Sequence, residues 1–229
     1  MNDGNTRKDV WEANIDSEIS FWRDFIMKRG GEWPDVYTGR MDPNCPFPGN
    51  LRDVVTARPD EPVEALDVGC GPLTLIGRHW PGRTVNVTAV DPLADHYMKL
   101  FREAGVTPPT PPQRCNGEEL LERFGPNRFH VAVAINSLDH SYDPVSAIEQ
   151  MVAVTKPNGF LWLRHRINEG EHEHYHGLHQ WNFKEENGRF LVWNSAMRVD
   201  MGEQLGSQCT VKARTDGEWV DVEIRKRPA

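Results

Sequence analysis

An apolar run that ends in two glycines constrains this chain more than any other feature. Residues Val63–Val68 are long enough for one buried strand, and Gly69 and Gly71 follow directly in the segment ALDVGCG. Glycine lets the backbone turn sharply and approach a ligand without a Cβ in the way. The pattern predicts a strand whose carboxyl end delivers a tight turn to a ligand-binding edge.

Short apolar runs and helical patterns alternate along the middle of the chain. Strands that alternate with helices form parallel βαβ units. We therefore predict an α/β fold of the Rossmann-like type, with a doubly wound, mainly parallel sheet. After the first strand, we expect strands at Val85–Val90, around Gln113–Cys115, at Phe129–Asn136 and at Phe160–His165, and helices at Ala94–Ala104 and Pro144–Val154.

The two ends of the chain depart from this alternation. Apolar residues between Trp11 and Ile26 recur at three- and four-residue steps and predict an N-terminal helix, whereas the Pro- and Gly-rich segment 33–50 is expected to be a loop. Asn187-Gly188 and Asp216-Gly217 each separate two apolar runs, as in tight hairpins. We therefore predict that antiparallel strands complete the sheet at its C-terminal end. We expect one domain over residues 1–229, with a helical cap and substrate lid in 1–58 and a catalytic core in 59–229.

Charge and cysteine content narrow the classes of partner. The formal net charge is −8, which argues against a nucleic-acid partner because phosphate contacts need a basic face. No apolar run approaches the roughly 20 residues of a membrane helix, and the N-terminus lacks the apolar core of a signal peptide. The four cysteines are far apart, as expected of reduced thiols in a cytoplasmic protein. We expect a small-molecule substrate, and the sequence is compatible with a homodimer.

Two acids extend the glycine-turn pattern toward a nucleoside ligand. Asp67 precedes Gly69 by two residues, and Asp91 ends the second expected strand, 20 residues after Gly71. An acid at the end of the second strand can accept hydrogen bonds from both ribose hydroxyls. A dinucleotide-binding turn would have a third glycine at position 74, where this chain has Thr74. The spacing favours an adenosine ligand without a pyrophosphate.

Several segments, taken in order, resemble a known series of motifs. They are Asp67-x-Gly69-x-Gly71, Val90-Asp91, Asn116-Gly117-Glu118, FHVAVAINSLDH and KPNGFLWLRH. The series is similar to that of class I S-adenosylmethionine (SAM)-dependent methyltransferases, over about residues 60–165. The resemblance implies SAM as cofactor. The alternative is a Rossmann-like domain that binds another nucleotide or no ligand.

The resemblance also implies roles for single residues. Asp67 and the two glycines would lie against the methionine part of SAM, and Asp91 would hold the ribose. The Asn116–Glu118 segment, including Gly117, would border the adenine. Asn136 would end the fourth strand beside the methyl group. From the residues themselves, Arg40 is a candidate to pair with the SAM carboxylate, because a guanidinium binds carboxylates in a bidentate manner.

The segment after the fourth strand offers a base for methyl transfer to oxygen. An alcohol must lose its proton as it attacks, whereas a nitrogen acceptor does not strictly need a base. His140 can take a proton near neutral pH, and it lies four residues after Asn136, the end of that strand. Asp139 could orient the substrate or hold a metal. The alternative for His140 is a histidine on the surface of a loop.

The segment RHRINEGEHEHYHGLHQW is unusually rich in histidine and glutamate. Imidazole and carboxylate ligands suit several divalent metals, so Asp139 and Glu169 are candidate ligands for Mg²⁺ or another divalent cation. The spacing matches no well-defined zinc motif. The alternative is a polar loop that binds substrate or water, with His165, His174 and His176 as substrate contacts.

The N-terminal region supplies a further substrate contact, Tyr37. The short N-terminal helix, the Leu-Asp-His triplet and the His-rich segment resemble bacterial sugar and polysaccharide O-methyltransferases, including those of mycobacterial methylmannose polysaccharide synthesis. The resemblance implies methyl transfer to a hydroxyl of a small molecule, and specifically a sugar or glycoside. The alternatives are a natural-product acceptor, a nitrogen nucleophile, or a non-catalytic subunit with the SAM-binding fold.

Overall fold

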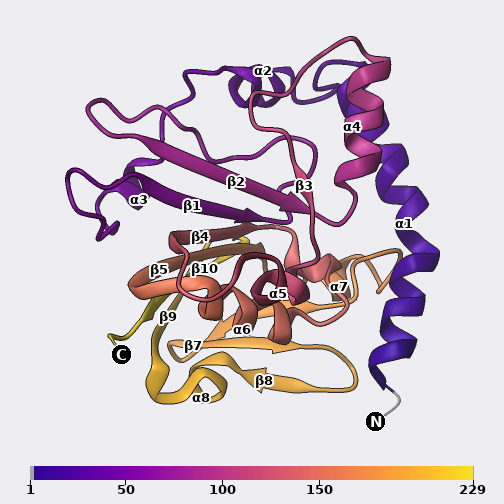
Figure 1. The fold of residues 1–229 in the computed structure, drawn as a ribbon. Helices are drawn as coiled ribbons and strands as arrows, with labels where there is room; N and C mark the ends of the chain where they lie inside the picture. Colours follow the sequence, from indigo (N-terminus) through magenta and orange to yellow (C-terminus); the bar gives the residue numbers. More distant parts are fainter. Residues whose placement is uncertain (1–2, 229) are drawn as a thin grey trace.

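The computed structural model describes residues 3–228. Its main sheet has seven strands in the order β3-β2-β1-β4-β5-β10-β9 (Figure 1). The first five in this order are parallel, and β10 and β9 run antiparallel to their neighbours. The prediction of a mainly parallel sheet with antiparallel strands at its C-terminal end is confirmed. The strands are β1 (Val63–Val68), β2 (Val85–Asp91), β3 (Gln113–Arg114), β4 (Phe129–Ile135), β5 (Thr155–Arg166), β9 (Cys209–Asp216) and β10 (Trp219–Lys226).

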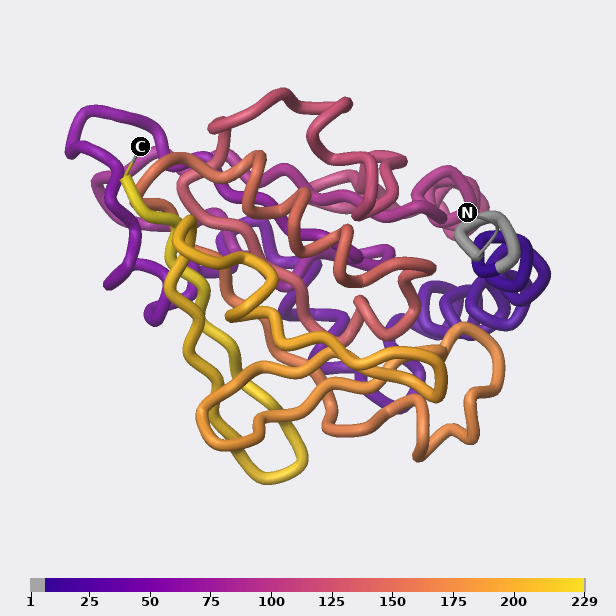
Figure 2. The backbone as a smooth tube through the Cα atoms, turned by 90° about the horizontal axis from the view of Figure 1, so that it is seen from below, coloured from indigo at the N-terminus to yellow at the C-terminus, as the bar shows by residue number. Residues whose placement is uncertain are grey.

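Helices cover the sheet on both faces and along one edge. The helix α1 lies beside α4 at one side of the molecule, and the strands β9 and β10 lie toward the other side (Figure 2). None of the helices within residues 3–228 is both long and apolar enough to cross a membrane. The helices are α1 (Asp3–Met27), α2 (Pro34–Met41), α3 (Gly49–Arg52), α4 (Ala94–Glu103), α5 (Leu120–Phe124), α6 (Pro144–Val154), α7 (Glu169–His172) and α8 (Met201–Leu205), with 3₁₀ turns η1 (Gly117–Glu119), η2 (Leu138–His140) and η3 (Gly206–Gln208).

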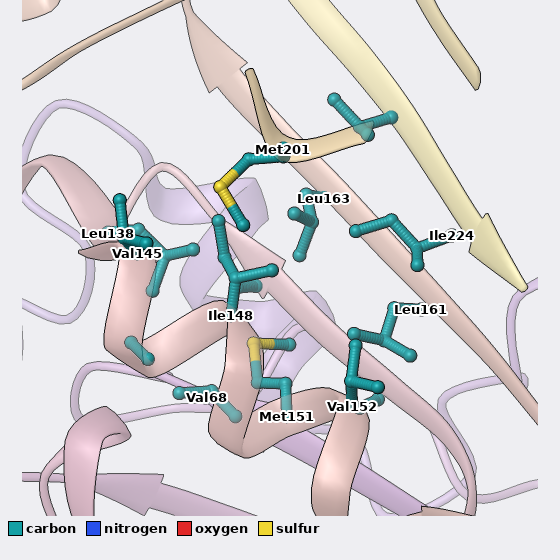
Figure 3. Close-up of a cluster of buried hydrophobic side chains, with 14 of the residues drawn as sticks. Val68, Leu138, Val145, Ile148, Met151, Val152, Leu161, Leu163, Met201 and Ile224 are labelled. Atoms are coloured by element: carbon teal, nitrogen blue, oxygen red, sulfur yellow. The ribbon is translucent and has the colours of Figure 1, made fainter. Parts of the chain in front are cut away.

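The helix α6 shows how the core is built. Asp143 caps its N-terminus by accepting a hydrogen bond from the backbone N–H of Ser146, and Pro144 occupies the first turn. Its apolar residues recur at helical spacing, so one face packs against the sheet. Figure 3 shows Val145, Ile148, Met151 and Val152 of this face against Leu161 and Leu163 of β5 and Ile224 of β10.

Two expectations about the ends of the chain were wrong. The segment 33–50 is not only a loop, because it contains α2 and the first two residues of α3. The Asn187-Gly188 hairpin does not extend the main sheet. It joins β6 (Asn182–Glu186) to β7 (Arg189–Trp193), which form a separate three-stranded sheet with β8 (Arg198–Asp200). The hairpin itself is confirmed, but the dipeptide carries no information about which sheet its strands enter.

Candidate active site

A cavity of about 450 Å³ lies where the carboxyl ends of β1, β2 and β4 meet. This is the edge at which open α/β sheets bind their ligands. Its wall comprises residues of α1, the turns after β1 and β2, and two later segments. They include Trp11, Glu18, Phe21, Trp22, Arg40, Asp67, Gly69, Gly71, Asp91, Asn116, Gly117, Glu118, Asn136, His140, Tyr142, His179 and Trp219. All nine residues expected to bind the cofactor are in this set.

The turn after β1 needs its two glycines because other parts of the protein lie close to it. Gly69 and Gly71 have φ values of 67° and 60°, in the left-handed region. A Cβ on Gly69 would lie 2.5 Å from the Cβ of Ser137, and one on Gly71 would lie 3.1 Å from a ring carbon of Trp22. From the sequence, these glycines are expected because they let a ligand approach the backbone. The structure shows that protein side chains also lie too close to leave room for a Cβ.

Asp67 and Arg40 lie together at one end of the cavity. The Asp67 carboxylate accepts hydrogen bonds from the Thr74 hydroxyl at 2.6 Å and the Leu75 N–H at 3.3 Å. Burial raises the pKa of Asp67 to about 6, although Thr74 and Arg40 oppose this shift. Arg40 donates to the Leu73 carbonyl, and its buried Nε has no partner among the described residues. The hydroxyl of Thr74, which replaces the third glycine of a dinucleotide turn, therefore anchors Asp67.

Asp91 joins the turn after β1 to the turn after β2. Its two carboxylate oxygens accept the backbone N–H groups of Gly71 and Leu93, each at 2.9 Å. Burial raises the pKa of Asp91 to about 7, and these two backbone hydrogen bonds partly offset the shift. Each oxygen retains a further lone pair, so the carboxylate can still accept hydrogen bonds from a ligand in the cavity.

Two further segments of the cavity wall are held by hydrogen bonds within the protein. Glu118 accepts hydrogen bonds from the Ser141 hydroxyl and the Asp143 N–H, and burial raises its pKa. Asn136 has a left-handed φ of 45° directly after β4, and its side-chain oxygen accepts the Arg166 N–H. The backbone therefore turns away from the sheet at Asn136 and carries the next four residues along the cavity.

Asp139, His140 and His179 form a compact group at the cavity. The Nδ1 atom of His179 lies 2.7 Å from Asp139 Oδ2 and 3.1 Å from His140 Nε2, and His140 Nε2 lies 3.4 Å from the same carboxylate oxygen. Asp139 is buried, and its Oδ1 has no partner among the described residues. Burial opposes ionisation of Asp139, but the two histidines outweigh it and hold its pKa below the ordinary value. In turn, the bond to Asp139 raises the pKa of His179 despite burial.

Four residues expected to contact the substrate lie elsewhere. Tyr37 is buried in α2 against Phe25, and His165 is buried beneath the site. His174 and His176 are exposed in the loop after α7, where their rings pack against each other. None of the four lines the cavity, so we do not propose them as substrate contacts.

His179 and the α1 residues that line the cavity were not among the site residues expected from the sequence. His179 lies between Leu178 and Trp181, the two apolar side chains that return the polar loop to the interior. In the sequence, only this apolar pair indicates that His179 reaches the site and that His174 and His176 do not.

The expected metal ligands are only partly brought together. Asp139, His140 and His179 each offer one ligand atom, and these atoms lie within 4.8 Å of one another. Glu169 is not in this group. It is buried with one carboxylate oxygen 3.5 Å from the Nε of Arg166. The structure therefore favours His179 over Glu169 as a candidate metal ligand beside Asp139.

Comparison with known proteins agrees with this geometry. Residues 66–163 match the family described as methyltransferase domain. The chain is similar in fold to several solved structures, three of which follow. The cyclase SpnF has 15% identity and a TM-score of 0.47, and 79% of each chain is covered. An S-adenosylmethionine-dependent methyltransferase from Clostridium acetobutylicum has 13% identity, a TM-score of 0.41 and coverage of 72% of this chain and 84% of that chain. The 1,6-didemethyltoxoflavin-N1-methyltransferase from Burkholderia thailandensis has 17% identity, a TM-score of 0.43 and coverage of 92% and 89%. No curated protein sequence matches the chain.

Proposed function

We propose that this chain is a class I SAM-dependent methyltransferase that methylates a hydroxyl group of a small molecule, with a carbohydrate as the expected acceptor. The match of residues 66–163 to a methyltransferase domain supports the first part of this proposal. The observation that carries the proposal is the position of His140. It lines the same cavity as Asp91 and Asn136, and it is backed by the buried Asp139. A base at that place suits an oxygen acceptor, which must lose a proton during attack.

The side chains that line the cavity suit the chemical groups of SAM. SAM supplies a methyl group on a sulfonium that is electrophilic without further activation. Arg40, with an unpartnered Nε, suits the carboxylate of the methionine part, and Asp91 suits the ribose hydroxyls. The segment Asn116–Glu118 is proposed to border the adenine, and Asn136 to lie beside the methyl group.

The surroundings of His140 indicate which ring nitrogen acts as the base. Its Nε2 faces Asp139 and His179, whereas its Nδ1 lies 3.8 Å from Glu18, another residue of the cavity wall. We assign the neutral ring the tautomer with a proton on Nε2, directed at Asp139. The Nδ1 atom then takes the proton of the attacking hydroxyl, and Asp139 stabilises the imidazolium that forms, as a carboxylate does in hydrolytic triads.

The walls of the cavity support a carbohydrate acceptor. Six aromatic residues line it, namely Trp11, Phe21, Trp22, Tyr97, Tyr142 and Trp219. Flat apolar rings pack against the C–H faces of sugars, and the neighbouring carboxylates and imidazoles can bind the hydroxyls. A flat natural product with a hydroxyl group would pack against the same aromatic side chains. Activity assays with sugars and with hydroxylated natural products would distinguish the two classes of acceptor.

Replacing His140 tests the proposed mechanism. In His140→Ala, kcat should fall by about 10²–10⁴, because a general base contributes that much. SAM affinity should stay nearly unchanged, since His140 acts on the acceptor. Activity of the wild type should rise with pH through an ionisation that the variant lacks. The matched control is His176→Ala, which removes an exposed histidine outside the cavity. A loss of less than about tenfold would place the base elsewhere or indicate a nitrogen acceptor.

A divalent metal is the second candidate for activating the hydroxyl. Ligand atoms of Asp139, His140 and His179 form a triangle with sides of 2.7, 3.1 and 3.4 Å. Two imidazole nitrogens and a carboxylate oxygen are ligands that suit a divalent transition metal, which would polarise the acceptor hydroxyl if it were bound there. In this case the three side chains would hold the ion, and His140 would not act as the base.

Chelation separates the two routes. If the metal route operates, exhaustive chelation abolishes activity and magnesium or manganese restores it, and Asp139→Asn raises the metal concentration needed. Full activity in protein shown to be metal-free by elemental analysis would eliminate the metal route and leave His140 as the base.

We also propose that the protein acts in the cytoplasm. The support is that Cys45, Cys70, Cys115 and Cys209 are all unpaired, as is usual where thiols are kept reduced. Mass spectrometry of alkylated protein from intact cells would test this, because an oxidising compartment would leave these thiols modified.

A further inference from the structure

The helix α1 places one carboxylate, Glu18, on the cavity wall. Its Oε1 accepts a hydrogen bond from the Trp22 indole N–H at 2.6 Å, and its Oε2 lies 3.8 Å from His140 Nδ1. Trp22 itself lies over Gly71, at the turn after β1. Glu18 is thus held in a defined position above the part of the cavity between that turn and His140.

This part of the cavity is short of positive charge. Asp91 faces it from the sheet, and Glu18 is close enough to add to the effect of burial in raising the pKa of Asp91. Among the described residues that line the cavity, the only lysine or arginine is Arg40. Arg40 lies beside Asp67 and donates to the Leu73 carbonyl. Two carboxylates that share a partly buried space favour a cation between them.

The chemistry of the cofactor places a cation there. The sulfur of SAM is bonded to the 5′ carbon of its ribose. A ribose on Asp91 and a methyl group directed toward His140 therefore put the sulfonium between these two residues, which is the space that Glu18 faces. This step rests on the proposed function, because it assumes that SAM occupies the cavity in that orientation.

We propose that Glu18 is the counter-ion of the SAM sulfonium, so that α1 distinguishes SAM from the product S-adenosylhomocysteine. Methyl transfer turns the sulfonium into an uncharged thioether. The attraction to Glu18 exists before the reaction and is lost after it. The same helix that closes the cavity thereby favours the substrate form of the cofactor and helps to release the product form.

Calorimetric binding of three ligands tests the proposal. SAM and sinefungin carry a positive charge at or near the sulfur position, and S-adenosylhomocysteine does not. In Glu18→Gln the side chain can still accept the Trp22 N–H, so the packing of α1 is retained. The affinity for SAM and sinefungin should fall about tenfold, because a charge-assisted interaction is lost, while that for S-adenosylhomocysteine should change less than about twofold. The matched control, Glu12→Gln, alters an exposed glutamate of the same helix and should change none of the three.

The outcomes separate this proposal from the one it rests on. If the wild type binds SAM, and Glu18→Gln lowers the affinities for all three ligands equally or changes none of them, the counter-ion role is refuted while the methyltransferase assignment stands. If the wild type does not bind SAM at all, the proposed occupancy of the cavity itself fails. Circular dichroism and thermal unfolding of each variant show whether α1 remains folded.

Discussion

Asp91 combines a structural role with a proposed ligand-binding role. Its carboxylate fixes the turns after β1 and β2 through the N–H groups of Gly71 and Leu93. In Asp91→Ala the hydrogen bonds to the ribose are also lost, each worth roughly 1.5–3 kcal/mol with a charged acceptor. SAM affinity should fall at least about tenfold while circular dichroism shows a folded protein. Unchanged affinity in a folded variant would show that the ribose lies elsewhere.

The raised pKa of Asp91 predicts how SAM binding depends on pH. Without ligand the carboxyl has a pKa of about 7, so it is half protonated near neutrality. Only the ionised form accepts hydrogen bonds from ribose hydroxyls with both oxygens. SAM affinity should therefore rise as pH increases from about 6 to 8. Calorimetric titrations across this range should show the rise in the wild type and a much flatter profile in Asp91→Ala. Identical profiles would assign the dependence to another group, such as Asp67.

At this same scale, the sequence predicted the position of the proposed cofactor residues at the cavity, whereas the four residues expected to contact the substrate do not line it. Cofactor residues lie at strand ends, and the position of a strand end follows from the apolar pattern. His174 and His176 were chosen because they are polar and clustered, which does not decide whether a loop residue faces the cavity or the solvent. His179 faces the cavity because Leu178 and Trp181 are buried on either side of it.

Among the elements, the β1 turn offers a direct test of packing. Gly69→Ala places a Cβ 2.5 Å from that of Ser137, in addition to the cost of a left-handed φ. Gly82→Ala is the control, because Gly82 also has a positive φ but open space around it. The control should lose about 1–2 kcal/mol of unfolding free energy, and Gly69→Ala about 1–3 kcal/mol more. Urea unfolding of both variants measures the difference. Equal losses would show that the segment at Ser137 can move away.

The elements of the central sheet were predictable because each strand is a short apolar run bounded by turn residues. The bounds of β1 and α6 agree with the expected ones at both ends. The helix α2 was missed because its sequence, PDVYTGRM, contains a proline, an aspartate and a glycine, which are typical of loops. Its proline is nevertheless tolerated in the first turn. The smaller sheet was missed because hairpin patterns are local, whereas the assignment of a hairpin to a sheet depends on long-range packing.

At the scale of the whole molecule, the two sheets share one apolar core. Phe183 and Phe190 of the smaller sheet belong to the same buried cluster as Leu163 and Val220 of the main sheet. His165 of β5 lies at this junction, with its ring stacked on Phe183 at a centroid distance of 4.5 Å. Because the sheets pack through buried apolar side chains, we expect the stability of the molecule to respond to any charge that develops there.

His165 therefore predicts a pH dependence of global stability. It is fully buried, neither ring nitrogen has a hydrogen-bond partner among the described residues, and burial lowers its pKa from 6.5 to about 4. Between these two values the unfolded chain binds a proton at this position and the folded protein does not. Stability from this group is thus fully present above about pH 6.5 and is lost as pH falls toward 4, by about 3 kcal/mol in total.

The variant His165→Leu isolates this contribution. Leucine fills a similar volume, and no hydrogen bond is lost. The two proteins should respond in parallel to pH above about 7, whereas the wild type should lose up to about 3 kcal/mol relative to the variant between pH 6.5 and 4. Asp67 and Asp91 also titrate in or near this range, but they are present in both proteins, so their effects largely cancel in the difference. Urea unfolding of both proteins at half-unit steps of pH measures the difference in their unfolding free energies. A difference that stays constant across the range would mean that His165 is protonated as readily in the folded protein as in the unfolded chain.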